Sequence, residues 1–315
     1  MSACAKSRLR CAAALLLTVG CLSSNGIAHA DDVDFAGPVG IGDGRDLYLN
    51  CQGSAPPGTP TVFVIPGKGS YVEAWNAAVL ADDPIRSSPY DLVEQAKIEP
   101  SLESAQPIVA KTTRSCVYDR PNTRPDGSDL STPVTQPHTV QSDVDDVVSL
   151  IVAAQLPTPM VFVAHSYGGL VLDLLARTHP ELVSGLVFAE PTSEFLPAVG
   201  RPDQNAAFNA DSDGVDNAGG EAILPDDAYA RIAVAPPLPR VPAIVLSGDK
   251  FPPPSAVKPD NYTQAQIHRA NDMLAAALGT TNVVVPGTGH NVMLYQPQAL
   301  ADQILAVVDQ VRAAP

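Results

Sequence analysis

MVFVAHSYGG, residues 160–169, is the stretch that decides the fold expected for this chain. Four apolar, β-prone residues form a buried strand, a short turn follows, and a helix runs from Gly168 to about Thr178. Small residues must flank the turn, because it is sharp and the helix backbone passes close to the strand. This is the context in which a G-x-S-x-G motif presents a serine, here with Ala164 in place of the first glycine. We therefore expect Ser166 in a strained conformation, with its hydroxyl exposed above a sheet.

Strands and helices alternate on both sides of this stretch. Apolar or β-prone runs predict strands at 46–49, 61–65, 116–118, 160–163, 183–188, 241–246 and 282–285. Helical spacing predicts helices at 138–155, 168–178, 261–278 and 298–311. Because the strands are apolar on both faces, we expect an α/β fold with a mostly parallel sheet and helices on both sides.

Two segments do not fit this alternation of strands and helices. Residues 70–115 separate two strands by more than one helix requires, and residues 191–240 are rich in Pro, Gly, Asp and Ala. Both are interpreted as insertions at one end of the sheet, and residues 191–240 as a small lid.

The composition indicates a folded, acidic protein. Of 315 residues, 45% are hydrophobic and only 17% charged, so disorder of the whole chain is excluded. The formal net charge is −15 at pH 7. Binding to a phosphate backbone needs the opposite field, so nucleic acid is not an expected partner.

The first thirty residues have the pattern of a secretory signal peptide. Basic residues from Lys6 to Arg10 precede an apolar run from Cys11 to Leu22, and Ala28-His29-Ala30 supplies small residues for cleavage. The apolar run is shorter than the roughly 20 residues of a membrane span, and no later stretch is long and apolar enough. We expect cleavage near Ala30, a mature domain over residues 31–315, and a secreted or cell-envelope location. Lipidation at Cys21 is an open alternative.

Beyond the serine turn, the mature chain resembles the α/β-hydrolase family from about Leu47 to Val311. The resemblance rests on Ile65-Pro66-Gly67-Lys68-Gly69-Ser70, Tyr118-Asp119-Arg120, the serine turn, Leu246-Ser247-Gly248-Asp249 and Gly287-Thr288-Gly289-His290. The order of serine, aspartate and histidine along the chain is that of this fold. Tyr118-Asp119-Arg120 is interpreted as a strand end with a charge pair and no catalytic role.

The resemblance implies a catalytic triad. Ser166 is the nucleophile and His290 the base, and Asp249 would orient and stabilise the imidazole. Glu190 is the alternative acid, because it just follows the strand at 183–188 and some relatives take their acid there. The family often sets its acid three residues after the glycine, where this chain has Phe251. His165 adjoins the serine, but its side chain is expected to point away.

The same resemblance implies an oxyanion hole and a disulfide. The oxyanion donors would be the backbone N–H groups of Lys68 and Tyr167. In the family sheet, the strand that corresponds to residues 46–49 runs antiparallel to its neighbour, which corresponds to residues 116–118. This arrangement places Cys51 beside Cys116 at the same edge, and we predict that they form a disulfide.

These features together predict a secreted serine hydrolase that cleaves a carboxylic ester of a small molecule through an acyl-enzyme on Ser166. We expect neither a cofactor nor a metal site. A peptidase or a cofactor-free haloperoxidase with the same triad stays open, as does a non-catalytic binding protein of the same fold. The residues do not identify the substrate.

Overall fold

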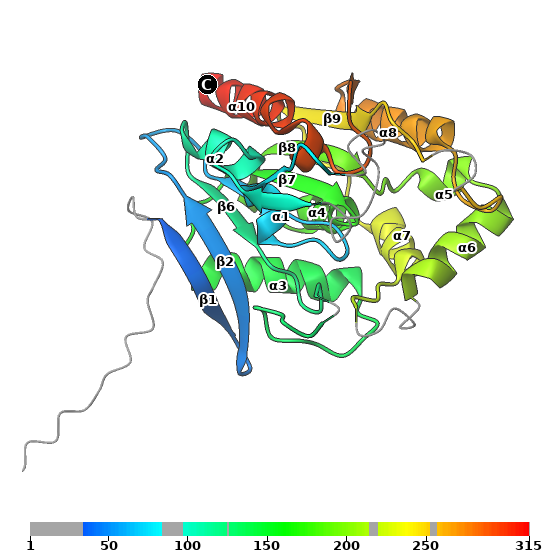
Figure 1. Cartoon of the computed structure of the whole chain (residues 1–315), viewed down its shortest axis with the longest axis horizontal. Helices are drawn as coiled ribbons and strands as arrows, with labels where there is room; N and C mark the ends of the chain where they lie inside the picture. Colours follow the sequence, from blue (N-terminus) through cyan, green and yellow to red (C-terminus); the bar gives the residue numbers. More distant parts are fainter. Residues whose placement is uncertain (1–33, 84–96, 125, 214–219, 253–256, 315) are drawn as a thin grey trace, which may run out of the picture.

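A computed structural model describes residues 34–83, 97–124, 126–213, 220–252 and 257–314 (Figure 1). Its centre is an eight-stranded sheet in the order β1-β2-β6-β3-β7-β8-β9-β10. The pairs β1–β2 and β2–β6 are antiparallel, and all other neighbours are parallel. The predicted α/β fold with a mostly parallel sheet is therefore confirmed. The strands are β1 (Phe35–Gly42), β2 (Arg45–Gln52), β3 (Val62–Ile65), β6 (Ser115–Tyr118), β7 (Met160–Ser166), β8 (Val183–Pro191), β9 (Ala243–Gly248) and β10 (Asn282–Val285).

Helices cover both faces of this sheet, and a small β4–β5 pair lies outside it. The helices are α1 (Val72–Asn76), α2 (Ala105–Ala110), α3 (Val140–Ala153), α4 (Gly168–Thr178), α5 (Leu196–Val199), α6 (Pro202–Asp213), α7 (Pro225–Val234), α8 (Gln264–Leu278), α9 (Val292–Tyr295) and α10 (Pro297–Ala313), with a 3-10 turn η2 (Pro180–Leu182). The pair consists of β4 (Ala77–Val79) and β5 (Ile98–Pro100).

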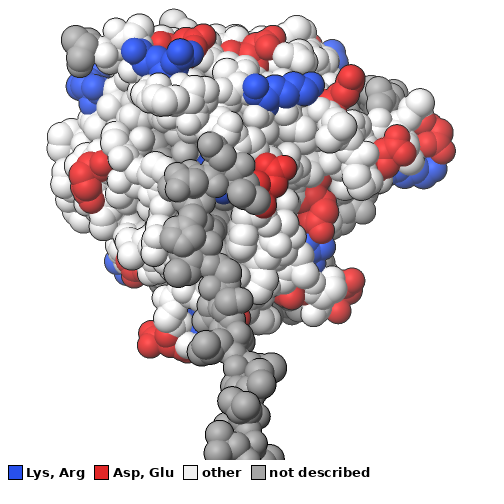
Figure 2. All heavy atoms as spheres, turned by 90° about the vertical axis from the view of Figure 1, so that its left-hand side faces the viewer, with Lys and Arg blue, Asp and Glu red and all other residues white. Residues whose placement is uncertain are grey.

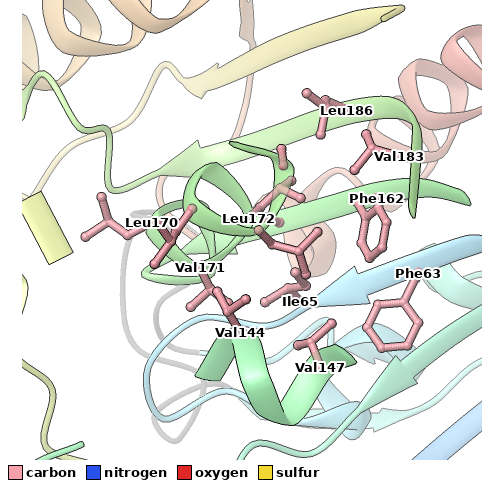
Figure 3. Close-up of a cluster of buried hydrophobic side chains, with 14 of the residues drawn as sticks. Phe63, Ile65, Val144, Val147, Phe162, Leu170, Val171, Leu172, Val183 and Leu186 are labelled. Carbon is pink, nitrogen blue, oxygen red and sulfur yellow. The ribbon is translucent and has the colours of Figure 1, made fainter. Parts of the chain in front are cut away.

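The core is built from strands that are buried on both faces. In β3, Phe63 and Ile65 pack with α3 and α4, whereas Val62 and Val64 pack on the other side with α2 and α10. Figure 3 shows Val144 of α3 beside Ile65 in the first of these clusters. Side chains alternate between the two faces of a strand, so such a run must be apolar throughout. This is the physical reason why the central strands could be predicted.

The first strand, β1, was not expected from the sequence. Its eight residues, FAGPVGIG, contain three glycines and a proline, which weaken any strand signal. Among the described strands, β1 pairs only with β2 and forms the edge of the sheet. Pro38 has no N–H to donate, and an edge position tolerates that loss.

The described part of the segment expected to be a lid contains three helices. α5, α6 and α7 all lie between β8 and β9 in the chain and extend beyond the sheet on the right of Figure 1. The expected signal peptide, residues 1–30, lies outside the described residues. Within the part of the chain that is described, no helix has the length and apolarity needed to cross a membrane.

The predicted disulfide is present. Cys51 of β2 faces Cys116 of β6 in the antiparallel register, with Cα atoms 4.0 Å apart, and the two sulfurs are bonded. Both side chains are fully buried. The bond therefore ties the antiparallel edge of the sheet to its parallel centre.

The surface charge is dispersed on the face shown in Figure 2. Basic and acidic side chains are both scattered there among uncharged residues, and neither sign gathers into a patch. The net negative charge of the chain is therefore not a concentrated field on this face.

Candidate active site

Ser166 ends β7 and stands in a strained backbone conformation. Its φ is +53°, in the left-handed region that costs a non-glycine residue free energy. α4 begins two residues later at Gly168, where an added Cβ would lie 2.4 Å from the carbonyl oxygen of Ile65. Only glycine permits so close an approach of helix and strand. The strained turn expected at Ser166 is confirmed.

The loop after β3 approaches the serine. The turn at 67–70 is closed by a hydrogen bond from Ser70 N to Gly67 O, 3.1 Å long. A Cβ on Gly67 would lie 2.7 Å from the Cβ of Ser166, so glycine is required there too. Lys68 follows directly, and Tyr167 follows Ser166. The two residues expected to supply oxyanion donors therefore flank the serine from two different strands.

Ser166, Glu190 and His290 line one cavity of about 320 Å³. It lies at the ends of β7 and β8, and α6, α8 and the loops beside them complete its wall. Most of the other side chains in the wall are apolar or aromatic; they include Leu196, Phe208, Phe251, Val257, Tyr262 and Ile267. A concave, largely apolar cavity with a few convergent polar groups is the usual form of a small-molecule site.

His290 lies in the loop between β10 and α9, as expected from the chain order. Burial lowers the pKa of its imidazole to about 4, so the ring is the neutral free base at pH 7. A neutral imidazole is the form that can accept a proton from a hydroxyl.

His165 contributes to this site, although it was expected to point away. Its Nε2–H donates to the backbone oxygen of His290 at 2.8 Å, and the two rings lie 4.6 Å apart. Burial, and then the neighbouring His290, lower the pKa of His165 to about 3. The expectation for this side chain was wrong: His165 still belongs to β7 and lies on the strand face of Val161 and Val163, which packs with α9, just after the loop that follows β10.

Glu190 is a buried carboxyl group at the end of β8, with an unusual backbone. Its φ is +46°, and the residue is 6% exposed. Burial raises its pKa to about 8, opposed by a hydrogen bond from Gly248 N to Oε2 of 2.8 Å. Strain and a displaced pKa together are typical of functional positions.

Asp249 lies just after β9 in a different environment. Its Oδ1 accepts from Gly287 N at 2.7 Å, and its Oδ2 lies 3.2 Å from the ammonium group of Lys250. Although burial opposes the effect, these contacts lower the pKa of Asp249 below its ordinary value. Asp249 is not among the described residues that line the cavity. The structure thus brings Glu190, rather than Asp249, to the cavity of Ser166 and His290.

No metal site is evident in the described part of the chain. Among those residues, no group of three or more His, Cys, Asp or Glu side chains could hold a metal ion.

Comparison with known sequences gives one family match. The model described as "Alpha/beta hydrolase family" matches residues 101–303. An uncharacterized protein of Schizosaccharomyces pombe is 28% identical over 148 residues. That match covers 47% of this chain but only 26% of the relative, so the chain spans about a quarter of the length of that relative.

Comparison with solved structures gives similar folds at low identity. Carboxylesterase CesB from Bacillus subtilis is 15% identical with a TM-score of 0.54, over 88% of this chain and 92% of that one. A putative lipase from Acinetobacter baumannii AYE is 16% identical with a TM-score of 0.55, over the same shares. The thioesterase domain from the curacin biosynthetic pathway is 15% identical, at 0.52, over 87% and 100%. At such identities the likeness shows the fold alone.

Proposed function

This chain belongs to the alpha/beta hydrolase family, and we propose that it is a secreted serine hydrolase that cleaves carboxylic esters of small molecules. The observation that carries the proposal is that Ser166, on a strained turn, shares one cavity with His290 and a buried carboxyl group. The structural neighbours described as a carboxylesterase, a putative lipase and a thioesterase agree with ester chemistry. The proposed secretion rests on the signal-peptide pattern of residues 1–30.

The proposed reaction has two halves. Ser166 Oγ attacks the ester carbon and gives its proton to His290, and the backbone N–H groups of Lys68 and Tyr167 stabilise the resulting oxyanion. Collapse breaks the ester bond, and the leaving alkoxide takes the proton from His290. Water then attacks the acyl-enzyme through the same base, which releases a carboxylic acid and restores Ser166. The sum is ester plus water to acid plus alcohol.

Protonation of the base needs support from a carboxylate. Because burial holds the pKa of His290 near 4, the imidazolium is costly in this cavity. A carboxylate beside the ring stabilises that charge and orients the imidazole, which is the task of the acid in a triad. The chain offers Asp249 and Glu190 for this role.

Two observations support Glu190 over Asp249 as the acid. Glu190 is buried and lines the cavity with His290, whereas the Asp249 carboxylate is 29% exposed and engaged by Lys250. Glu190 also carries backbone strain, which folding retains only where the surroundings enforce it.

A matched pair of variants decides between the two acids. We expect Glu190→Gln to lower kcat by about 10³-fold or more, and Asp249→Asn by less than about tenfold. The reverse order would return the role to Asp249. Both substitutions replace a carboxyl group by an amide of nearly the same size, so each serves as the control for the other.

Hydrolysis of p-nitrophenyl esters of graded acyl length tests the reaction itself. The apolar cavity favours acyl groups that fill it, so kcat/KM is expected to rise with chain length and then fall once the cavity is full. Ser166→Ala is expected to abolish turnover while leaving the thermal unfolding transition in place. Turnover by Ser166→Ala at the wild-type rate would refute the proposal, and a folded wild type without turnover would favour a binding protein.

A further inference from the structure

A cluster of buried charges lies behind the proposed oxyanion loop and takes no part in the chemistry described above. It consists of Arg120, His138, Asp143 and Glu221, none of which lines the cavity among the described residues. Arg120 and Glu221 are separated by 101 residues in the chain, yet the guanidinium Nε donates to Glu221 Oε1 at 3.0 Å. Both side chains are completely buried. Ionic groups in such a place are costly unless they are fully paired.

Glu221 contacts the oxyanion loop directly. Its Oε2 accepts from the backbone N–H of Gly69 at 2.9 Å. Gly69 has a φ of +65° and stands directly after Lys68, whose N–H is a proposed oxyanion donor. The contact therefore holds the peptide unit that joins Lys68 to Gly69. Since Ser70 N also closes the turn onto Gly67 O, the loop is held at both of its ends.

The same cluster contacts the second proposed donor, Tyr167. The hydroxyl of Tyr167 donates to Asp143 Oδ2 at 2.8 Å, and the guanidinium carbon of Arg120 lies 4.8 Å from the ring centroid. The Tyr167 side chain is 2% exposed. The two residues that supply oxyanion donors are thus linked through one set of buried hydrogen bonds.

His138 completes the charge balance of the cluster. Its Nδ1 lies 3.1 Å from Asp143 Oδ1 and its Nε2 lies 3.0 Å from Glu221 Oε1. Both ring nitrogens face carboxylates, so only the doubly protonated ring donates to both. With Arg120, the cluster then holds two positive and two negative charges.

We propose that Glu221 is a positioning residue, whose carboxylate, held by Arg120 and His138, fixes the amide of Gly69 and thereby aims the Lys68 N–H at the substrate oxygen. The inference rests on the proposed serine hydrolase function. It gives the described residues just before α7 a role in the reaction, because Glu221 is one of them. It also assigns a role to the strand end Asp119-Arg120, for which the sequence indicated none: Arg120 holds Glu221, whereas Asp119 accepts from Val72 N.

The expected effect lies in the transition state rather than in substrate binding. An oxyanion donor contacts the developing charge only after attack, and loss of one donor lowers kcat by about 10²–10³-fold. A donor that is present but poorly aligned is expected to lower kcat by only part of that factor. We expect Glu221→Gln to lower kcat by about 10–100-fold, with KM changed by less than about twofold.

A boronic acid that forms a tetrahedral adduct with Ser166 provides the second measurement. Its affinity is expected to fall by the same factor as kcat, because the adduct places an oxygen in the oxyanion hole. The carboxylic acid product, which carries no developing charge, should bind Glu221→Gln as it binds wild type. A merely structural role would change both affinities or neither.

Asp173→Asn is the matched control. Asp173 is equally buried and pairs with Arg177 at 2.5 Å, on α4 and away from the oxyanion loop. Loss of that ion pair is expected to lower the melting temperature as Glu221→Gln does, but to leave kcat within about twofold of wild type. Should Glu221→Gln not fold, Glu221→Asp keeps the charge but shortens the reach to Gly69, and the same fall in kcat and boronate affinity is expected.

The outcomes separate the two proposals. Wild type that hydrolyses esters, together with a folded Glu221 variant of unchanged kcat and boronate affinity, would overturn the positioning role and leave the hydrolase intact. Wild type that neither hydrolyses esters nor binds the boronic acid would overturn the hydrolase itself.

Discussion

Two buried groups of titratable side chains lie near the loop at 67–70, and their charge states at pH 7 differ. Around Ser166, burial lowers the pKa values of His165 and His290 to about 3 and 4 and raises that of Glu190 to about 8. Near Gly69, burial alone would lower the pKa of His138, but the Asp143 and Glu221 carboxylates raise it to about 9.

The difference lies in the partners rather than in the depth of burial. His138 has a carboxylate at each ring nitrogen, whereas His165 donates to a backbone oxygen and lies beside another imidazole. Desolvation therefore prevails at the cavity and ion pairing prevails behind the loop. In the first group His290 stays unprotonated and can act as a base. In the second group the side chains stay charged, and Glu221 holds the loop at Gly69.

Removal of the proposed base has the largest expected effect. His290→Ala should lower kcat/KM by at least about 10⁴-fold, because no other described imidazole shares the cavity with Ser166. His179→Ala, on a partly exposed histidine paired with Glu181, is the control and should leave kcat/KM unchanged. Steady-state kinetics on one ester decides, and a loss below tenfold in His290→Ala would contradict the assignment.

The next prediction concerns the charged group and how the free energy of unfolding depends on pH. The folded-state pKa of His138, about 9, exceeds its ordinary value of 6.5, so its stabilisation is complete below pH 6.5 and disappears as the pH rises through about 9. The shift corresponds to about 3 kcal/mol.

Urea unfolding of wild type and His138→Gln at several pH values measures this directly. The difference in free energy of unfolding between the two proteins should shrink by about 3 kcal/mol from pH 6 to pH 10. The comparison with the variant removes the contributions of Glu190 and other groups that titrate in this range. A difference that stays constant would show that His138 is not held as a cation.

A smaller effect is expected in the acid limb of the rate profile. With a pKa of about 4, His290 is still about 90% unprotonated at pH 5, whereas an ordinary histidine would be about 3% unprotonated. We expect the limb that protonation of His290 produces to centre near pH 4, and a separate limb near pH 8, where the Glu190 carboxylate takes up its proton. A limb centred on pH 6.5 would place the proposed base in a more solvated or more anionic setting.

The smallest expected effect is that of His165. His165→Phe keeps the ring packed against His290 but removes the hydrogen bond to its backbone oxygen, which is worth about 1 kcal/mol. We expect kcat/KM to fall by about five- to tenfold, with no change in the acid limb. His165→Phe with wild-type kinetics would show that the hydrogen bond does not orient His290.

These two groups also differ in how far the sequence could predict them. The turn at Ser166 follows from local chemistry, since a buried strand, small residues and a helix start are all visible in MVFVAHSYGG. The Cys51–Cys116 bond followed from the strand arrangement that the resemblance implied. Both depend on periodicity and connection order, which a sequence displays.

The charged group behind the loop follows neither from periodicity nor from connection order. Glu221 stands in a segment rich in Gly, Asp and Ala, and its partners Arg120 and His138 lie 101 and 83 residues away. No local spacing relates three residues from three separate loops. His165 was missed for a different reason. Strand alternation puts its side chain on the face of Val161 and Val163, but the sequence does not show that the loop after β10 brings His290 to that face.

Covalent labelling tests the central claim most directly. Wild-type protein is treated with a fluorophosphonate and digested, and the modified peptide is identified by mass spectrometry. We predict a single adduct, on the peptide that contains Ser166, and labelling that is slowed at least about 10³-fold in His290→Ala. A wild type that hydrolyses esters but carries the adduct on another residue, or labels equally fast without His290, would contradict the account.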